Sequence, residues 1–254
     1  MTDISFQLYS ARTAPDLAAT LQMLAATGYT QVEGYGALYA DAAKVQELQA
    51  ALAQTGLKMP SGHFSLDMLE TQPDRVCEIA SMVGIERVFC PHIGPEDRAS
   101  DAAGWRAFGE RLEKAGKPIR DAGHAFGWHN HDFEFAALDD GSTPMEHILA
   151  GGPGLEWEAD IAWIIRGGAD PLDWIAKQGD RITAVHVKDI APEGECTDED
   201  GWADVGQGTV DWAGLVAALK GKGVKLWVAE HDKPSDPERF AKRSFDAISK
   251  IMGA

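Results

Sequence analysis

Short apolar runs recur along the chain, and each is followed by a segment in which apolar residues return every three or four positions. The first pattern predicts buried β-strands and the second predicts amphipathic helices. The runs that we interpret as strands are Ile4–Tyr9, Gln31–Gly34, Lys58–His63, Arg87–His92, Phe126–His131, Gly154–Asp160, Ile182–Lys188 and Lys225–Glu230. Their starts are about 25 to 40 residues apart, which is the span of a strand–helix unit with its crossover.

The clearest helical segments lie between these runs and after the last one. They are Asp16–Thr27, Ala42–Gln54, Pro73–Val83 and Pro237–Ile251. Strict alternation of strand and helix predicts a parallel sheet covered by helices. Eight such units in 254 residues predict a single (β/α)8 TIM barrel that spans 1–254. A doubly wound open sheet is the main competitor, but no glycine-rich turn follows the first strand.

The longest irregular segment, Ile190–Gly208, is rich in acidic residues and lies between the seventh strand and its helix. A loop of this length in a compact domain usually serves as a lid or as a substrate-binding loop.

The composition of the chain limits the kinds of molecule that the protein can bind. The formal net charge of −17 makes nucleic acid and anionic membrane poor partners, because both repel an acidic surface. Three widely spaced cysteines form no disulfide framework, no secretion signal precedes the first strand, and no apolar run has the length of a membrane span. We therefore expect a cytoplasmic protein that acts on a small molecule, and we leave open whether it forms a homo-oligomer.

Histidine, aspartate or glutamate ends nearly every predicted strand. These polar ends are Glu33, His63, His92, the segment His129-Asn130-His131 with Glu134 just after it, Asp160, His186 with Lys188, and Glu230. The active site of a TIM barrel lies at the carboxyl ends of its strands. Packing alone does not explain such a series, so we interpret it as the rim of an active site.

Four of these residues form the best candidate for a metal site: Glu134, Asp160, His186 and Glu230. Several ionised carboxylates at one end of a barrel are expensive to bury unless a cation compensates them. Imidazole combined with carboxylates suits a divalent ion. We expect one such ion, with Mn²⁺ preferred and Zn²⁺, Co²⁺ or Mg²⁺ as alternatives.

The chain resembles the sugar phosphate isomerase/epimerase family, whose barrels are also described as xylose-isomerase-like or as AP endonuclease family 2-like. The segments that carry the resemblance are Phe6–Arg12, Ser61–His63, Trp128–Phe135, Glu158–Trp163 with Gly168–Pro171, His186–Asp189, Val205–Trp212 and Trp227–Asp232. They cover nearly the whole length in the family's order.

The resemblance implies a metal held at the ends of strands five to eight, and it places Asp160, His186 and Glu230 among the ligands. The fifth strand departs from the family. Many relatives have Glu at the position of His129, whereas the first glutamate of this segment is Glu134, five residues further along the chain. Either Glu134 reaches back to the metal or His129 binds it directly; we favour Glu134.

The resemblance also implies proton abstraction next to a carbonyl of a sugar or keto-sugar, with the metal stabilising the enediolate. The expected catalytic residues are His131, His129, Glu230 and Lys188. We expect Glu33, His63 and His92 to bind hydroxyl groups and Trp163 and Trp202 to stack on the sugar.

Several outcomes stay open at this point. Return of the proton gives isomerisation or epimerisation, whereas loss of a β-substituent makes the enzyme a lyase, by dehydration or by cleavage of a 3-keto-glycoside. Phosphodiester hydrolysis at abasic DNA is disfavoured by the negative charge. A non-catalytic carbohydrate-binding barrel is disfavoured by the complete set of candidate ligands.

Overall fold

The computed structural model describes residues 3–253 and contains the expected closed barrel. Its eight parallel strands are β1 Ser5–Gln7, β2 Gln31–Gly34, β3 Lys58–His63, β4 Arg87–Cys90, β5 Ala125–His129, β6 Glu156–Asp160, β7 Ile182–Val187 and β10 Leu226–Ala229. Neighbours in the barrel follow the chain, and β1 closes the ring by pairing with both β2 and β10. The fold class predicted from the sequence is confirmed.

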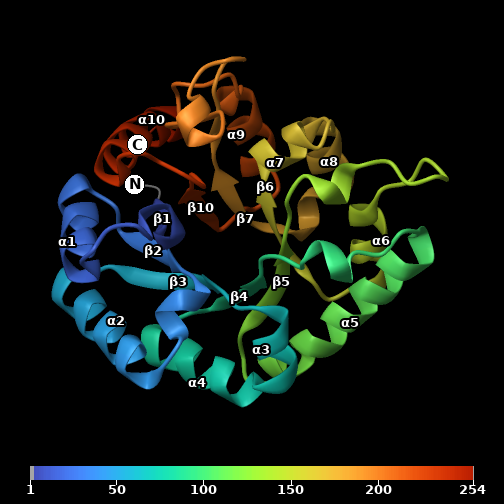
Figure 1. Ribbon diagram of the computed structural model, residues 1–254, viewed down its shortest axis with the longest axis horizontal. Helices are drawn as coiled ribbons and strands as arrows, with labels where there is room; N and C mark the ends of the chain where they lie inside the picture. The colour runs from blue at the N-terminus through green and yellow to red at the C-terminus, as the bar shows by residue number, and fades with distance from the viewer. Residues whose placement is uncertain (1–2, 254) are drawn as a thin grey trace.

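The helices form a ring around this barrel (Figure 1). They are α1 Leu17–Thr27, α2 Ala42–Thr55, α3 Leu66–Thr71, α4 Pro73–Val83, α5 Ala102–Asp121, α6 Pro144–Gly151, α7 Ile161–Arg166, α8 Pro171–Gln178, α9 Trp212–Lys220 and α10 Pro237–Met252. Aspartate side chains begin several of them, as Asp16 does by accepting a hydrogen bond from the backbone N–H of Ala19.

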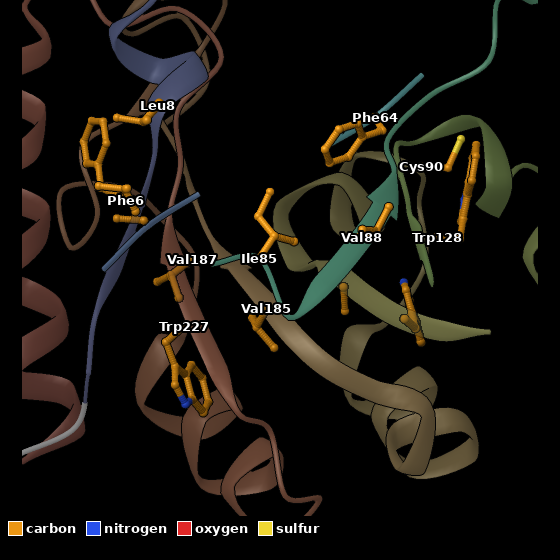
Figure 2. Packing of buried hydrophobic residues seen from close by; sticks show 14 of the residues in the cluster. Phe6, Leu8, Phe64, Ile85, Val88, Cys90, Trp128, Val185, Val187 and Trp227 are labelled. Carbon is orange, nitrogen blue, oxygen red and sulfur yellow. The ribbon is translucent and has the colours of Figure 1, made fainter. Parts of the chain in front are cut away.

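Alternation along each strand separates two apolar regions. Val185 and Val187 of β7, with Val88 and Cys90 of β4, belong to the large cluster between strands and helices (Figure 2). Residues of the opposite parity point into the barrel, as side chains alternate along a strand. There Phe89, Ala184, Leu226 and Val228 form a small apolar cluster of their own.

Gly127 makes room for this inner packing. A Cβ atom at position 127 would lie 2.3 Å from the carbonyl oxygen of Glu156 and 2.9 Å from the ring of Phe89. Only glycine at this point of β5 lets Phe89 fill the barrel, and the polar residues of the strand ends therefore lie on an apolar floor.

The segment between β7 and α9 is more ordered than the sequence indicates. It contains a two-stranded antiparallel ribbon of β8 Asp189–Ile190 and β9 Trp202–Ala203. Two of its acidic side chains, Glu199 and Asp204, are buried and both accept hydrogen bonds from Arg239 of α10. The interpretation as an irregular segment is corrected, because this ribbon and these ion pairs attach it to the body.

Candidate active site at the carboxyl ends of the strands

Strand register brings the polar strand ends to two depths of the barrel. His129 of β5 is paired with Glu158 of β6, and Asp160 of β6 is paired with His186 of β7. Glu158 and Asp160 share the inward face of β6, two residues apart, so Asp160 lies nearer the mouth. This spacing produces an outer group and an inner group of ligand-type side chains.

The outer group consists of Asp160, His186 and Glu230, whose ligand atoms all lie within 4.8 Å of one another. Nδ1 of His186 is 3.8 Å from Oδ2 of Asp160. Among the described residues, Oδ2 of Asp160 and Nδ1 of His186 are buried without a hydrogen-bond partner, and the buried Oε2 of Glu230 faces only the ammonium of Lys188. Buried polar atoms are rarely left without partners, so these three atoms fit a divalent cation that they would bind together.

The ammonium of Lys188 lies beside the outer group. It is 2.9 Å from Oε2 of Glu230 and 3.6 Å from Oδ2 of Asp160, and it donates a hydrogen bond to Asp232. Burial lowers the pKa of Lys188, but the three carboxylates outweigh it and raise the pKa above its ordinary value. Lys188 therefore stays charged and partly balances the carboxylates.

Burial also raises the pKa values of the two carboxyl groups in the outer group. It raises the pKa of Glu230 to about 7, with Asp232 acting in the same direction and Lys188 opposing. The pKa of Asp160 is raised as well, first by burial, although Lys188 and His186 lower it. Carboxylates that resist ionisation in this way are those that a nearby cation would stabilise most.

The inner group consists of His63, His129, Glu158 and His186. Oε2 of Glu158 lies 2.6 Å from Nε2 of His63, 3.3 Å from Nδ1 of His129 and 3.4 Å from Nε2 of His186. Glu33 lies against the same imidazoles, with Oε1 2.8 Å from Nε2 of His186, and it accepts a hydrogen bond from Gln7. Glu33 and His63 thus contact buried partners, whereas the sequence led us to expect contacts with substrate hydroxyls.

Glu134 is not part of either group, which corrects our preference for it as the fifth-strand ligand. Its Oε1 accepts a hydrogen bond from Nε1 of Trp128 at 3.0 Å, and its Oε2 accepts one from the backbone N–H of His131 at 3.0 Å. The short 3₁₀ turn Phe133–Phe135 folds the side chain back onto β5. Burial raises the pKa of Glu134 to about 8. Its contacts fix the turn that carries His131.

The mouth of the barrel is lined by His131, His92, Trp163 and Phe133. The ring of His131 lies 5.2 Å from that of His92 and 5.4 Å from that of Trp163, measured between centroids. Burial and then the charge of Lys188 lower the pKa of His131 well below its ordinary value, so the ring is neutral. Its Nδ1 has no hydrogen-bond partner among the described residues.

Trp202 is not available for stacking on a sugar, contrary to the expectation from its position. It is 1% exposed, with the guanidinium of Arg166 3.2 Å and the ammonium of Lys188 4.0 Å from the centroid of its ring. Trp163 packs edge-on against it at 4.7 Å and keeps part of its surface exposed. Only Trp163 of this pair can contact a ligand at the mouth.

Asn130 holds the ends of β5 and β6 together, a role that the sequence analysis did not find. Its Oδ1 accepts hydrogen bonds from Nε1 of Trp157 and from the backbone N–H of Asp160, and its Nδ2 donates to the carbonyl of Asp160. The alternation rule points Asn130 away from the barrel interior, and nothing local reveals partners 27 and 30 residues away. Asp232 was missed for a similar reason, because its partner Lys188 is 44 residues away, just after β7.

Comparison with known proteins identifies the family to which this barrel belongs. The model of the xylose isomerase-like TIM barrel matches residues 21–251. The chain belongs to the xylose isomerase-like TIM barrel family. No curated protein matches the chain in sequence.

Solved structures share the fold of this xylose isomerase-like barrel. A sugar phosphate isomerase/epimerase from Parabacteroides distasonis is 18% identical, with a TM-score of 0.81 over 98% of this chain and 93% of the other. A probable 3-DHS dehydratase from Bacillus anthracis is 13% identical, with a TM-score of 0.75 over 98% and 99%. The IolI protein with a bound zinc atom is 14% identical, with a TM-score of 0.78 over 99% and 98%. At these identities the likeness shows the fold.

Within residues 3–253, no helix combines the length and the apolar character needed to span a membrane.

Proposed function

We propose that this xylose isomerase-like barrel is a divalent-metal-dependent isomerase or epimerase of a sugar or keto-sugar, which removes and returns a proton next to a carbonyl group. The observation that carries the proposal is the outer group, where buried ligand atoms of Asp160, His186 and Glu230 lie within 4.8 Å of one another. Family membership and a neighbour described as a sugar phosphate isomerase/epimerase support it.

In this proposal Asp160, His186 and Glu230 hold the ion, with Mn²⁺ preferred. A bound divalent ion supplies Lewis acidity to the carbonyl oxygen. Three protein ligands leave further positions free, which is the arrangement of catalytic rather than structural sites. Lys188 keeps Glu230 and Asp232 in place through its ion pairs.

His131 is the proposed proton carrier. Its side chain is partly exposed and uncharged, and its buried Nδ1 has no hydrogen-bond partner among the described residues, so this nitrogen can take up a proton without breaking a contact. If His131 delivers the proton to the neighbouring carbon, the product is an isomer; if a second group protonates the same carbon from the opposite face, the product is an epimer. His129 lies deeper, against Glu158, so we assign it no role in proton transfer.

Sugar contacts are proposed for His92 and Trp163. The imidazole of His92 is exposed and lies 3.3 Å from the guanidinium of Arg98, which itself stacks on the ring of Phe133. An aromatic face beside hydrogen-bonding groups is the usual composition of a small-molecule site.

A lyase or dehydratase on the same intermediate is the second candidate. The adjacent rings of His92 and His131 favour it, because an imidazole that has taken up the substrate proton then holds the proton that a leaving hydroxyl or glycosyl oxygen requires. A neighbour of the same fold is described as a probable dehydratase.

The test is incubation in D₂O with ketoses, inososes and 3-keto-glucosides, with and without added Mn²⁺, followed by NMR and mass spectrometry. Deuterium at the carbon next to the carbonyl, with the substrate's composition retained, is the expected result. Release of water or of an aglycone instead would favour the lyase. If no substrate exchanges hydrogen with the solvent in either condition, the proton-transfer proposal is wrong.

A further inference from the structure

The inner group has the composition and spacing of a metal site of its own. It gathers His63 from β3, His129 from β5, Glu158 from β6 and His186 from β7 around one point inside the barrel. All four side chains are nearly or fully buried, and their exposed fractions do not exceed 9%.

Hydrogen bonds satisfy this group only in part, since they pair Oε2 of Glu158 with His63 and Oε1 of Glu33 with His186. Among the described residues, Oε1 of Glu158, Nδ1 of His129 and Oε2 of the adjacent Glu33 are buried without a hydrogen-bond partner. The ion pairs found for Glu33 and Glu158 run to imidazoles only, and no lysine or arginine is among them. The positive charge that two buried carboxylates require therefore comes from protonated imidazoles or from a cation that replaces their protons.

We propose that these four residues bind a second divalent ion, of the borderline class that includes Zn²⁺, separate from the ion of the proposed function. This site goes beyond that function, because its geometry does not depend on which reaction occurs at the mouth. It adds an inner metal centre to a barrel whose outer group we have already assigned to the catalytic ion.

Two of the three contacts of Glu158 have the length expected around four-coordinate zinc. Zn–N and Zn–O bonds of about 2.0–2.1 Å in a tetrahedron separate the ligand atoms by roughly 3.3–3.4 Å. Oε2 of Glu158 lies 3.3 Å from Nδ1 of His129 and 3.4 Å from Nε2 of His186. The contact of 2.6 Å between Glu158 and His63 is a hydrogen bond and lengthens by roughly 0.7 Å when an ion replaces its proton.

His186 faces both groups with different atoms. Its Nε2 is 3.4 Å from Oε2 of Glu158 on the inner side, whereas its Nδ1 is 3.8 Å from Oδ2 of Asp160 on the outer side. His186 can therefore bind both ions without a change of rotamer, provided that it releases its remaining ring proton and bridges them as an imidazolate.

Donor chemistry distinguishes the two sites. The inner group offers three imidazole nitrogens and one carboxylate, and the outer group offers two carboxylates and one imidazole. Imidazole-rich sites favour Zn²⁺, Co²⁺, Ni²⁺ and Cu²⁺, whereas oxygen-rich sites suit Mn²⁺ and Mg²⁺. We expect zinc or cobalt to fill the inner site and manganese to be confined to the outer one.

The experiment is metal analysis of the full chain by mass spectrometry after chelation, reloading with Zn²⁺ and desalting. Wild type is expected to retain two equivalents of zinc. Glu158→Gln and Asp160→Asn should each retain one, because each removes one site, and the double variant should retain none. His147→Gln is the control, since His147 contacts Ser142 outside both groups; it should retain two.

Two further measurements keep the test decisive. Circular dichroism checks that each variant folds, and His129→Gln replaces Glu158→Gln if the latter does not, because Nδ1 of His129 has no hydrogen-bond partner to lose among the described residues. Loading with Co²⁺ should give the intense visible absorption of a four-coordinate ion in Asp160→Asn and a much weaker spectrum in Glu158→Gln.

The outcomes separate this inference from the proposed function. One equivalent of zinc in wild type that Asp160→Asn abolishes and Glu158→Gln keeps overturns the inner site and leaves the catalytic ion in place. One equivalent that Glu158→Gln abolishes and Asp160→Asn keeps supports the inner site and contradicts the outer one. No retained zinc, or two equivalents in every variant, overturns the inner site.

Discussion

Nε2 of His63 lies 2.6 Å from Oε2 of Glu158 inside the barrel, and the pair joins β3 to β6 across its interior. Burial lowers the pKa of His63, but Glu33 and Glu158 outweigh it and raise the pKa to about 9. Burial and Glu33 raise the pKa of Glu158, but the imidazoles around it outweigh them and lower the pKa to about 2. In the metal-free protein these two groups are therefore oppositely charged over a wide range of pH.

The pair should contribute its full stabilisation to the metal-free protein between pH 4.5 and 6.5, the ordinary pKa values of the two groups. The contribution of Glu158 is present above pH 4.5 and is lost as the pH falls towards 2, because its folded pKa is depressed. The contribution of His63 is present below pH 6.5 and is lost as the pH rises through 9, because its folded pKa is raised. Urea unfolding of chelator-treated protein from acidic to alkaline pH measures how the free energy of unfolding falls at each end, on an acidic and an alkaline limb of the curve. His63→Gln should flatten the alkaline limb, and an unchanged limb would contradict the assignment.

Glu134→Gln should lower stability and leave metal content unchanged. The new amide nitrogen would face either Nε1–H of Trp128 or the backbone N–H of His131, so one buried donor loses its acceptor. We expect a loss of about 1–3 kcal/mol in the free energy of unfolding. Asp132→Asn, at an exposed neighbour, is the control. Loss of bound metal in Glu134→Gln alone would restore Glu134 as a ligand.

His131→Asn should reduce kcat by about 10²- to 10⁴-fold, because general-base catalysis contributes that much. Bound metal and the unfolding midpoint should be preserved, since His131 belongs to neither metal group. His147→Asn serves as the control outside the site. The assay is solvent deuterium exchange on the substrate identified in D₂O. Full exchange activity in His131→Asn would show that another group moves the proton.

Gly208→Ala should destabilise the loop after β9, where the Asp189 carboxylate accepts hydrogen bonds from the backbone N–H groups of Gly206, Gly208 and Val210. An added Cβ at 208 would lie 2.2 Å from Oδ1 of Asp189. Overpacking of this kind costs about 1–3 kcal/mol. Gly36→Ala is the matched control, because a Cβ there meets nothing within 4 Å. Equal unfolding midpoints for the two variants would refute the argument.

Arg239→Gln should expose the segment between β7 and α9 to proteolysis. The guanidinium holds Glu199 and Asp204 of that segment, and removal of a hydrogen-bonded charge costs about 1.5–3 kcal/mol. Arg243→Gln should have a smaller effect, near the 0–1 kcal/mol or so of an exposed ion pair, because Arg243 is 58% exposed and contacts Asp204 only. Cleavage rates between residues 190 and 208 compare the two variants; similar rates would rule out the Arg239 contacts as the main restraint.

The sequence by itself determined the eight strands, the main helices and their closure into a barrel. Alternation and helical periodicity are local properties, and so are the helix ends: Asp16 begins α1 through its side chain and Gly84 ends α4 through its left-handed backbone. The sequence also indicated that Asp160, His186 and Glu230 share one end of the barrel, since the carboxyl ends of parallel strands meet there.

Only the tertiary structure decided which of the polar residues lie together and at which depth of the barrel. The register between strands places Glu158 and His129 together below Asp160, a depth that no single strand reveals. Glu134 turns to Trp128 because the 3₁₀ turn after β5 reverses its direction, and Trp202 is covered by Arg166 from α7. Contacts between residues distant in sequence depend on the packing of whole elements, so local sequence patterns do not predict them.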